Sequence, residues 1–259
     1  MLGTSIYALS LFIPNKWAYR TAAASLVAGF IIHTGSFTSR IAGVGFPPVT
    51  TLYDALSFMA WAIIGIYLIV FIRYKIRIIG VFVSPIALVL MLSAYSMPKE
   101  IDVFVIPYMK TFWLPAHIIL VFIGNGFFAL AFAVAVMYLI QERQIKSKKM
   151  GRMYHLLPSI NILDTINHRA ILWGFPLLTL GIIFGAIVAG SMRGGFFTWG
   201  NNEIWTLTTW ILYAVLIHGR IYSGWRGKKA AILSIFTFIV LLITFFGINI
   251  LFGRGISFH

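Results

Sequence analysis

The sequence predicts an all-α fold, a polytopic membrane helix bundle of about seven spans with one short N-terminal interfacial or truncated helix. Three observations lead to this prediction. The chain of 259 residues is 60% hydrophobic and only 10% charged, whereas a soluble domain carries roughly 25% charged residues. Apolar stretches of about 20 residues recur along the chain, which is the length that a helix needs to cross the hydrocarbon core. The short alternating segments of a membrane β-barrel are not seen.

The first apolar stretch is too short to span a membrane comfortably. Residues 2–14 would make about 20 Å of helix, and Pro14-Asn15-Lys16 then interrupts the run. The stretch lacks a basic region and a small-residue cleavage site, so we do not interpret it as a removed signal peptide. We expect it to form the interfacial or truncated helix.

Seven apolar stretches follow, separated by polar segments and by loops that contain Gly and Pro. The loop at 36–55 precedes the second stretch, a basic cluster at 73–77 follows it, and the one sizeable polar segment covers 141–169. The fourth stretch is long, so we expect it to tilt or to extend past the bilayer. We predict a single integral membrane domain over 1–259, with spans at about 17–35, 56–72, 78–95, 112–140, 170–189, 204–217 and 230–252.

Basic residues gather on one side of this arrangement. That side holds segment 141–169, the 73–77 cluster and most of the 20 Lys and Arg residues, while most of the six acidic residues fall on the other side. The positive-inside rule therefore places the basic loops in the cytoplasm, and the tryptophan-rich loop and the C-terminus outside. We expect a multi-pass protein of the inner (cytoplasmic) membrane.

The net charge of +14 follows this topology, so it does not indicate a nucleic-acid partner. The partner that it suggests is membrane lipid. The basic stretch at 143–152 is either a topology signal alone or also a contact for anionic headgroups.

Several kinds of chemistry find no support in the sequence. The chain has no cysteine, which excludes disulfides and thiolate metal sites. Nucleotide-binding, zinc-protease and hydrolase motifs are not found, and no catalytic residue is evident. Asp54, at the edge of the second span, is the acidic residue that comes nearest to a span interior, which argues against a transporter of small ions.

The stretch Gly195–Arg220 draws attention because it concentrates tryptophan at the membrane surface. Trp199, Trp205 and Trp210 lie at or just inside the surface, and His218 follows near the inner end of the span. Tryptophans at an interface commonly anchor a span. They could also bear a flat aromatic ligand.

Histidines are the plausible neutral nitrogen ligands, since a histidine inside a span is costly enough to need a reason. Helical rise puts His33, His117 and His259 toward the outer face, and His168 and His218 toward the inner face. An outer site could draw on the first three. An inner site could draw on the last two, or on a partner chain. Taken singly, each histidine also fits a hydrogen-bonded packing residue.

The chain resembles the cytochrome c assembly proteins of the CcsA/ResC type, the tryptophan-rich (WWD) haem-handling family. The resemblance runs from about Thr34 to the C-terminus, and the matching segments follow the family's order. They are TGSFTSRIAGVGFPPVTTLYDALSFMAW, VIPYMKTFWLPAHIIL, LDTINHRAILWGFPLLTLGIIFGAI, TWGNNEIWTLTTWILYAVLIHGR and FGINILFGRG.

The resemblance implies that haem is carried to the outer face and held there for attachment to apocytochrome c. In the family, external haem lies on the tryptophan-rich loop between two outward histidines, and a further histidine binds haem within the membrane. By position, His117 in WLPAH matches the first outward ligand and His218 in LIHGR matches the intramembrane ligand. The family's C-terminal ligand aligns with Ser257, and His259 could take its place.

The tryptophan-rich loop departs from the family's pattern. Family tryptophans are replaced at Val188, Arg193 and Phe197, and the family's Asp is Gly200, while Trp199, Glu203, Trp205 and Trp210 remain. Arg193 could pair with a haem propionate, since arginine suits carboxylates.

Three functions stay open. The first is haem delivery for c-type cytochrome maturation, with b-type, non-covalent haem (one or two), a ResB-like or other membrane partner subunit and a c-type cytochrome on the outer face. The second is quinone-linked electron transfer by resident haems, one between His33 and His117 and the other between His168 and His218. The third is a structural subunit that binds no haem.

Overall fold

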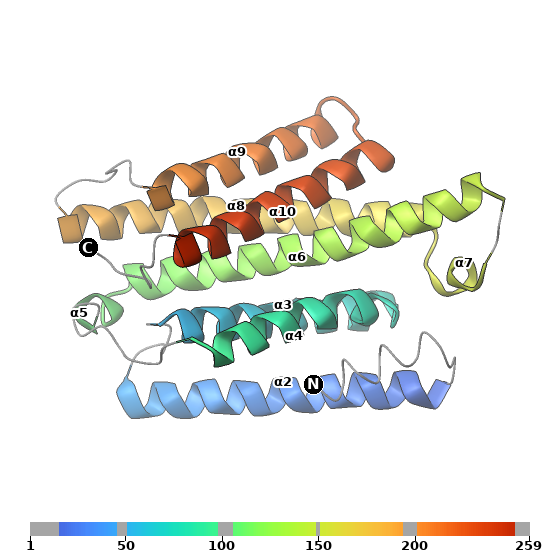
Figure 1. Cartoon of the computed structure of the whole chain (residues 1–259). Helices are drawn as coiled ribbons and strands as arrows, with labels where there is room; N and C mark the ends of the chain where they lie inside the picture. Colours follow the sequence, from blue (N-terminus) through green and yellow to red (C-terminus); the bar gives the residue numbers. More distant parts are fainter. Residues whose placement is uncertain (1–15, 46–50, 98–105, 149–150, 194–200, 252–259) are drawn as a thin grey trace. The chain divides into compact units, whose positions relative to one another are not determined.

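The computed structural model describes residues 16–45, 51–97, 106–148, 151–193 and 201–251, and every regular element in these ranges is an α-helix. The all-α prediction is therefore confirmed. Residues 2–14, expected to form a short N-terminal helix, lie outside the described ranges. The described ranges contain seven long helices (Figure 1), namely α2 (Lys16–Val44), α3 (Leu52–Tyr74), α4 (Ile79–Tyr95), α6 (Trp113–Lys146), α8 (Ile160–Arg193), α9 (Asn201–Ile221) and α10 (Lys228–Leu251).

Five of the described helices, α2, α3, α6, α8 and α9, are long and apolar enough to cross a membrane, and α4 is an apolar helix of 17 residues. The chain is therefore a multi-pass membrane protein. Helix α8 begins at Ile160, so part of the polar segment expected at 141–169 is helical. The physical reason is that Asp164 and Asn167 form hydrogen bonds with neighbouring helices of the bundle. The short helices α5 (Ile106–Met109) and α7 (Arg152–Leu156) lie in the connections.

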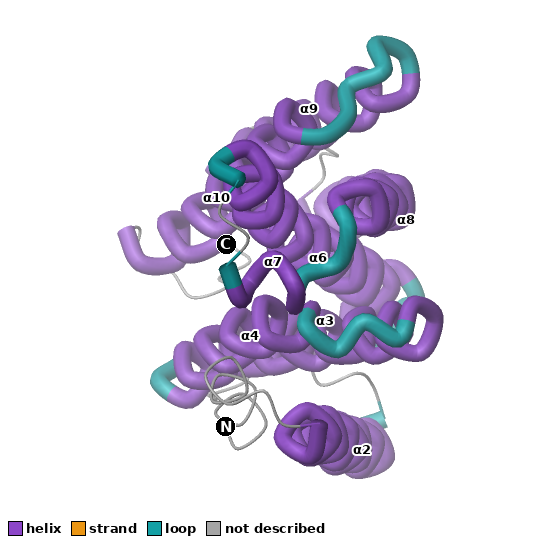
Figure 2. The backbone as a smooth tube through the Cα atoms, turned by 90° about the vertical axis from the view of Figure 1, so that its right-hand side faces the viewer, coloured by secondary structure: helices purple, strands orange, loops and turns teal. Residues whose placement is uncertain are grey.

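The chain packs into two compact units, residues 1–99 and 100–259. In the first unit, α3 and α4 lie side by side (Figure 2) and bury an aliphatic core. A capping box starts α3, because the Thr51 hydroxyl accepts from the Asp54 N–H while the Asp54 carboxylate accepts from the Thr51 N–H. Lys75 ends the helix in the left-handed conformation, with its N–H donating to Phe71 O.

Helix α2 packs on α3 through ring stacking and polar contacts. Trp61 stacks on Phe30 with centroids 5.2 Å apart, and its indole N–H donates to Thr34 Oγ1 over 2.8 Å. Arg40 forms an ion pair of 2.7 Å with the buried Asp54. These pairs run in opposite order along the two helices, so α2 and α3 are antiparallel.

The second unit is built on the close packing of α6 against α8. A Cβ added at Gly124 would meet the backbone of α8 at 3.1 Å, and one added at Gly174 would lie 2.6 Å from the Phe128 ring. Small residues at such positions allow membrane helices to approach closely. Helices α9 and α10 complete the unit, where Phe128 stacks on Tyr213 of α9 at 3.5 Å and Phe132 on Phe238 of α10 at 4.8 Å.

The turn between α9 and α10 depends on two glycines in the left-handed region, Gly224 (φ +63°) and Gly227 (φ +64°). A Cβ at Gly227 would lie 2.7 Å from the hydroxyl of Tyr138, whereas a Cβ at Gly224 would meet nothing within 4 Å. The ring of Trp225 lies over Gly219, and the backbone N–H of Trp225 donates to Gly219 O over 2.9 Å. The turn therefore packs against the last turn of α9.

These two glycines allow a matched stability test. We expect Gly224→Ala to lower the free energy of unfolding by about 1–2 kcal/mol, the cost of a left-handed conformation with a Cβ. Gly227→Ala should cost clearly more, because the new methyl group also collides with Tyr138. Unfolding of both variants in the same detergent measures the difference. Equal losses would show that the contact with Tyr138 does not constrain the turn.

Candidate functional site

His117 lies in the second turn of α6 and is held by α8. Its Nδ1 is 2.6 Å from the carbonyl oxygen of Gly181. A Cβ at Gly185 would lie 2.7 Å from Nδ1 and Cε1 of the ring. Gly185 therefore leaves the space that the imidazole fills, and Gly181 supplies its hydrogen-bond acceptor. Together, these two contacts form the seat of His117.

This seat fixes the tautomer of His117. A carbonyl oxygen only accepts, so Nδ1 must carry the proton and donate it. The other nitrogen, Nε2, then has its lone pair available. Histidines that bind metals in proteins are usually arranged in this way, with one nitrogen donating to a carbonyl or carboxylate and the other facing the metal.

An aromatic group stands next to His117, and the sequence interpretation did not single it out. Phe112, Trp113 and Phe184 make mutual edge contacts with centroids 5.3–6.0 Å apart. Trp113 precedes His117 by one helical turn, and Phe184 adjoins Gly185. Phe112 and Trp113 are exposed. The signal that could have found them is their spacing from His117 within FWLPAH.

His218 lies in the last turn of α9 and is exposed. Its ring stacks on that of Tyr222, with centroids 4.7 Å apart. Among the described residues, neither nitrogen of His218 has a hydrogen-bond partner. Both nitrogens are therefore open to a ligand that approaches the face of α9 that is turned away from the bundle.

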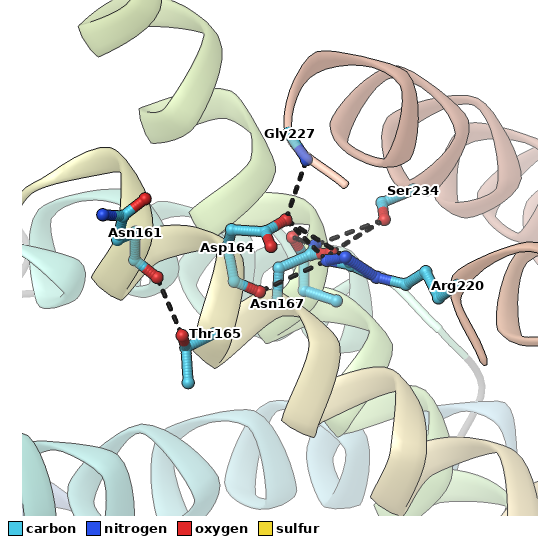
Figure 3. Close-up of polar contacts among 8 residues, drawn as sticks. Asn161, Asp164, Thr165, Asn167, Arg220, Gly227 and Ser234 are labelled. Atoms are coloured by element: carbon cyan, nitrogen blue, oxygen red, sulfur yellow. Dashed lines mark hydrogen bonds and ion pairs between the residues drawn. The ribbon is translucent and has the colours of Figure 1, made fainter. Parts of the chain in front are cut away.

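A buried polar network surrounds Arg220, two positions after His218 (Figure 3). Arg220 donates to Asp164 Oδ1 through both terminal nitrogens, at 3.1 and 2.8 Å, and to Asn167 Oδ1 at 2.9 Å. Asn167 in turn donates to Ala131 O of α6 at 2.8 Å and contacts Ser234 of α10 at 3.2 Å. The network thus joins α6, α8, α9 and α10 at the level of His218.

His117 and His218 stand at opposite ends of the second unit. His117 contacts α8 at residues 181–185, whereas Arg220, two residues beyond His218, contacts α8 at residues 164–167. The 16 or so residues of α8 between these levels correspond to about 24 Å. One metal ion cannot bind both histidines, so any ligands on them occupy separate sites.

The other two histidines of the described ranges that were expected to bind haem have different surroundings. His33 belongs to the first unit, where its Nε2 is 2.9 Å from Ser57 Oγ and its ring stacks on Phe37 at 4.8 Å. The Nδ1 of His168 is buried and has no partner among the described residues. No hydrogen bond or ring contact within those residues joins His168 to His218.

The tryptophan-rich stretch is described only in part. Trp205 is exposed at the start of α9. Trp210 stacks on Phe175 at 5.5 Å, and its indole N–H donates to Thr179 Oγ1 over 2.9 Å, so this ring joins α8 to α9. Trp199, His259 and the side chain of Arg193 lie outside the described residues.

The seat of His117 predicts a specific packing effect. Gly185→Ala should lower the free energy of unfolding by about 1–3 kcal/mol, because the new methyl group overpacks against the imidazole. Gly29→Ala is the matched control, since Gly29 lies within α2 and a Cβ there meets nothing within 4 Å. That change should be neutral or stabilise by up to about 1 kcal/mol through helix propensity. Unfolding curves that do not distinguish the two variants would contradict the claim that the His117 ring fills the space at Gly185.

The sequence has clear relatives. The model of the family "Cytochrome C assembly protein" matches residues 49–254. The chain is 28% identical over 291 residues to "Cytochrome c biogenesis protein CcsA" of Trieres chinensis, with 99% of this chain and 92% of that protein covered. It is 26% identical over 304 residues to the protein of the same name from Synechocystis (96% and 91%), and 29% identical over 232 residues to that of Guillardia theta (82% and 76%). The chain therefore belongs to the cytochrome c assembly protein family.

Proposed function

We propose that this protein binds haem non-covalently and delivers it for the maturation of c-type cytochromes. Membership of the family supports the role in cytochrome maturation. The observation that carries the haem proposal is the seat of His117, whose Nδ1 donates to Gly181 O and whose Nε2 is left as a ligand.

The outer haem would lie beside His117. His117 Nε2 would bind the iron, and the exposed rings of Phe112 and Trp113 would pack against the porphyrin edge. These rings offer aromatic surface in place of the family tryptophans that are replaced by Val188 and Arg193. His259 or a partner residue would supply a second ligand to the iron. The haem supplies the iron chemistry, while this chain binds and orients it.

The second haem position would lie against His218. Because His218 is exposed on α9, a ligand from another chain can approach it across the membrane face. A ResB-like membrane subunit would supply that ligand. In this arrangement the start of α6 faces the outer side, where the apocytochrome receives haem on its own cysteines, and the basic loops face the cytoplasm.

Resident haems that transfer electrons are the competing function. That function needs one haem between His33 and His117 and another between His168 and His218. One feature counts against it, because Ser57 already occupies Nε2 of His33. It remains the outcome to which the experiment below is compared.

Spectroscopy of the purified protein with its partner subunit tests the proposal. We expect a b-type haem spectrum, with bound haem measured as the pyridine haemochrome. His117→Ala and His218→Ala should each remove one haem position, and each should lower covalent haem in c-type cytochromes at least about tenfold. Even the loss of a residue that only hydrogen-bonds to a metal ligand costs about 10–100-fold in metal affinity. Gly185→Ala should weaken the outer position in the same direction as His117→Ala.

The control is His155→Ala, because His155 is an exposed residue of α7 and forms part of neither proposed position. It should leave haem content and cytochrome maturation unchanged. Two redox-active haems, one lost in His33→Ala and the other in His168→Ala, would overturn haem delivery and establish electron transfer. Complete absence of haem from the protein with its partner would leave only a structural role.

A further inference from the structure

One carboxylate oxygen accepts three hydrogen bonds that hold the C-terminal end of α9 and the turn after it. Asp164 Oδ1 accepts from both terminal nitrogens of Arg220 and, over 3.2 Å, from the backbone N–H of Gly227 in the α9–α10 turn. Arg220 also donates to the backbone oxygen of Asp164 at 3.2 Å. Figure 3 shows the guanidinium group reaching across to α8, with Gly227 and Ser234 on the side of α10.

The side chain of Arg220 is 2% exposed, while that of Asp164 is 22% exposed. The ion pair therefore sits at the boundary of the buried region. Removal of either partner would leave the other charge with fewer contacts in a poorly hydrated place. A buried ion pair is itself weak evidence for stability, and its best-attested role is to fix the register of packed helices.

For α9, the property that the ion pair can fix is the rotation of the helix about its own axis. Arg220 lies two positions after His218, which corresponds to a rotation of about 200° around the helix. When Arg220 points into the bundle, His218 must point outward. Gly219, between them, lies under the Trp225 ring, and Lys229 stands 3.7 Å over that ring. Both neighbours of His218 on its C-terminal side are thus held from inside the unit.

We propose that the Asp164–Arg220 ion pair, supported by Asn167 and Ser234, is a positioning device that fixes the rotation of α9 and thereby the direction in which His218 faces the membrane. Arg220 acts through the helix and touches no ligand at His218. The rotational role stands on the contacts alone. Only its consequence for a bound haem rests on the proposed function.

Distance measurement by electron paramagnetic resonance tests the rotation without haem. The chain has no cysteine, so His218→Cys together with Ile232→Cys gives two unique labelling sites. Both positions are exposed, and Ile232 is near the depth of His218 because its neighbour Ser234 bonds to Asn167. We expect one narrow distance in this pair. Adding Asp164→Asn should broaden the distribution or shift it by about 5 Å, half the width of a helix of ~10 Å.

Glu142→Gln is the matched control. It makes the same carboxylate-to-amide change in an ion pair with Lys146 whose Lys side chain is 67% exposed, and it should leave the distance unchanged. If Asp164→Asn does not fold, Arg220→Lys replaces it, because lysine keeps the charge but loses the two-pronged contact, and the same broadening is expected. An unchanged distribution in a folded variant would overturn the proposal.

A second readout follows the haem itself. In protein with native His218 that is loaded with protohaem, Asp164→Asn should change the reduction potential and the ferric g-values of the haem at His218, and Glu142→Gln should change neither. A change in the label distance with unaltered potential and g-values would overturn the coupling of the ion pair to the haem. Failure of the unsubstituted protein to take up haem would overturn the proposed function, and the label distances would still decide the rotational role.

Discussion

The close approach of α6 and α8 is the contact on which both candidate sites depend. Gly124 and Gly174 let the two backbones meet, with distances from an added Cβ to the opposing backbone of 3.1 Å at each. Lipid tails provide no hydrophobic drive between helices, so packing of this kind and interhelical hydrogen bonds must hold such a pair together. At one end of this interface α8 provides the seat of His117, and at the other end Asn167 bonds to Ala131 O.

The two ends of the interface hold their histidines in different ways. His117 is held directly: Gly181 O accepts the hydrogen bond that fixes the proton on Nδ1, and Gly185 leaves space for the ring. His218 has only a ring contact with Tyr222, and neither of its nitrogens is hydrogen-bonded among the described residues. Its direction follows from Arg220, which is anchored on the far side of α9. A half-buried histidine with a fixed tautomer suits a ligand position that is built within this chain. An exposed histidine whose nitrogens have no hydrogen bond suits a position that another chain completes.

Helix identity and the family could be predicted from the sequence because apolar length and motif order are properties of the chain itself. The network around Asp164 could not, because it depends on which helices become neighbours. The sequence places Asp164 within the polar segment 141–169 and does not indicate a partner for it. In the structure, the carboxylate accepts from Arg220, 56 positions further along the chain. Similarly, nothing in the sequence distinguished Gly185, whose importance arises only when α6 brings His117 against it.

An experimental density map of the haem-loaded protein tests the central claim most directly. The account predicts that the outer porphyrin iron is bonded to Nε2 of His117, with Nδ1 still within hydrogen-bond distance of Gly181 O and with Phe112 or Trp113 against the porphyrin. Iron bonded to Nδ1, or a haem held on this side without His117, would contradict it.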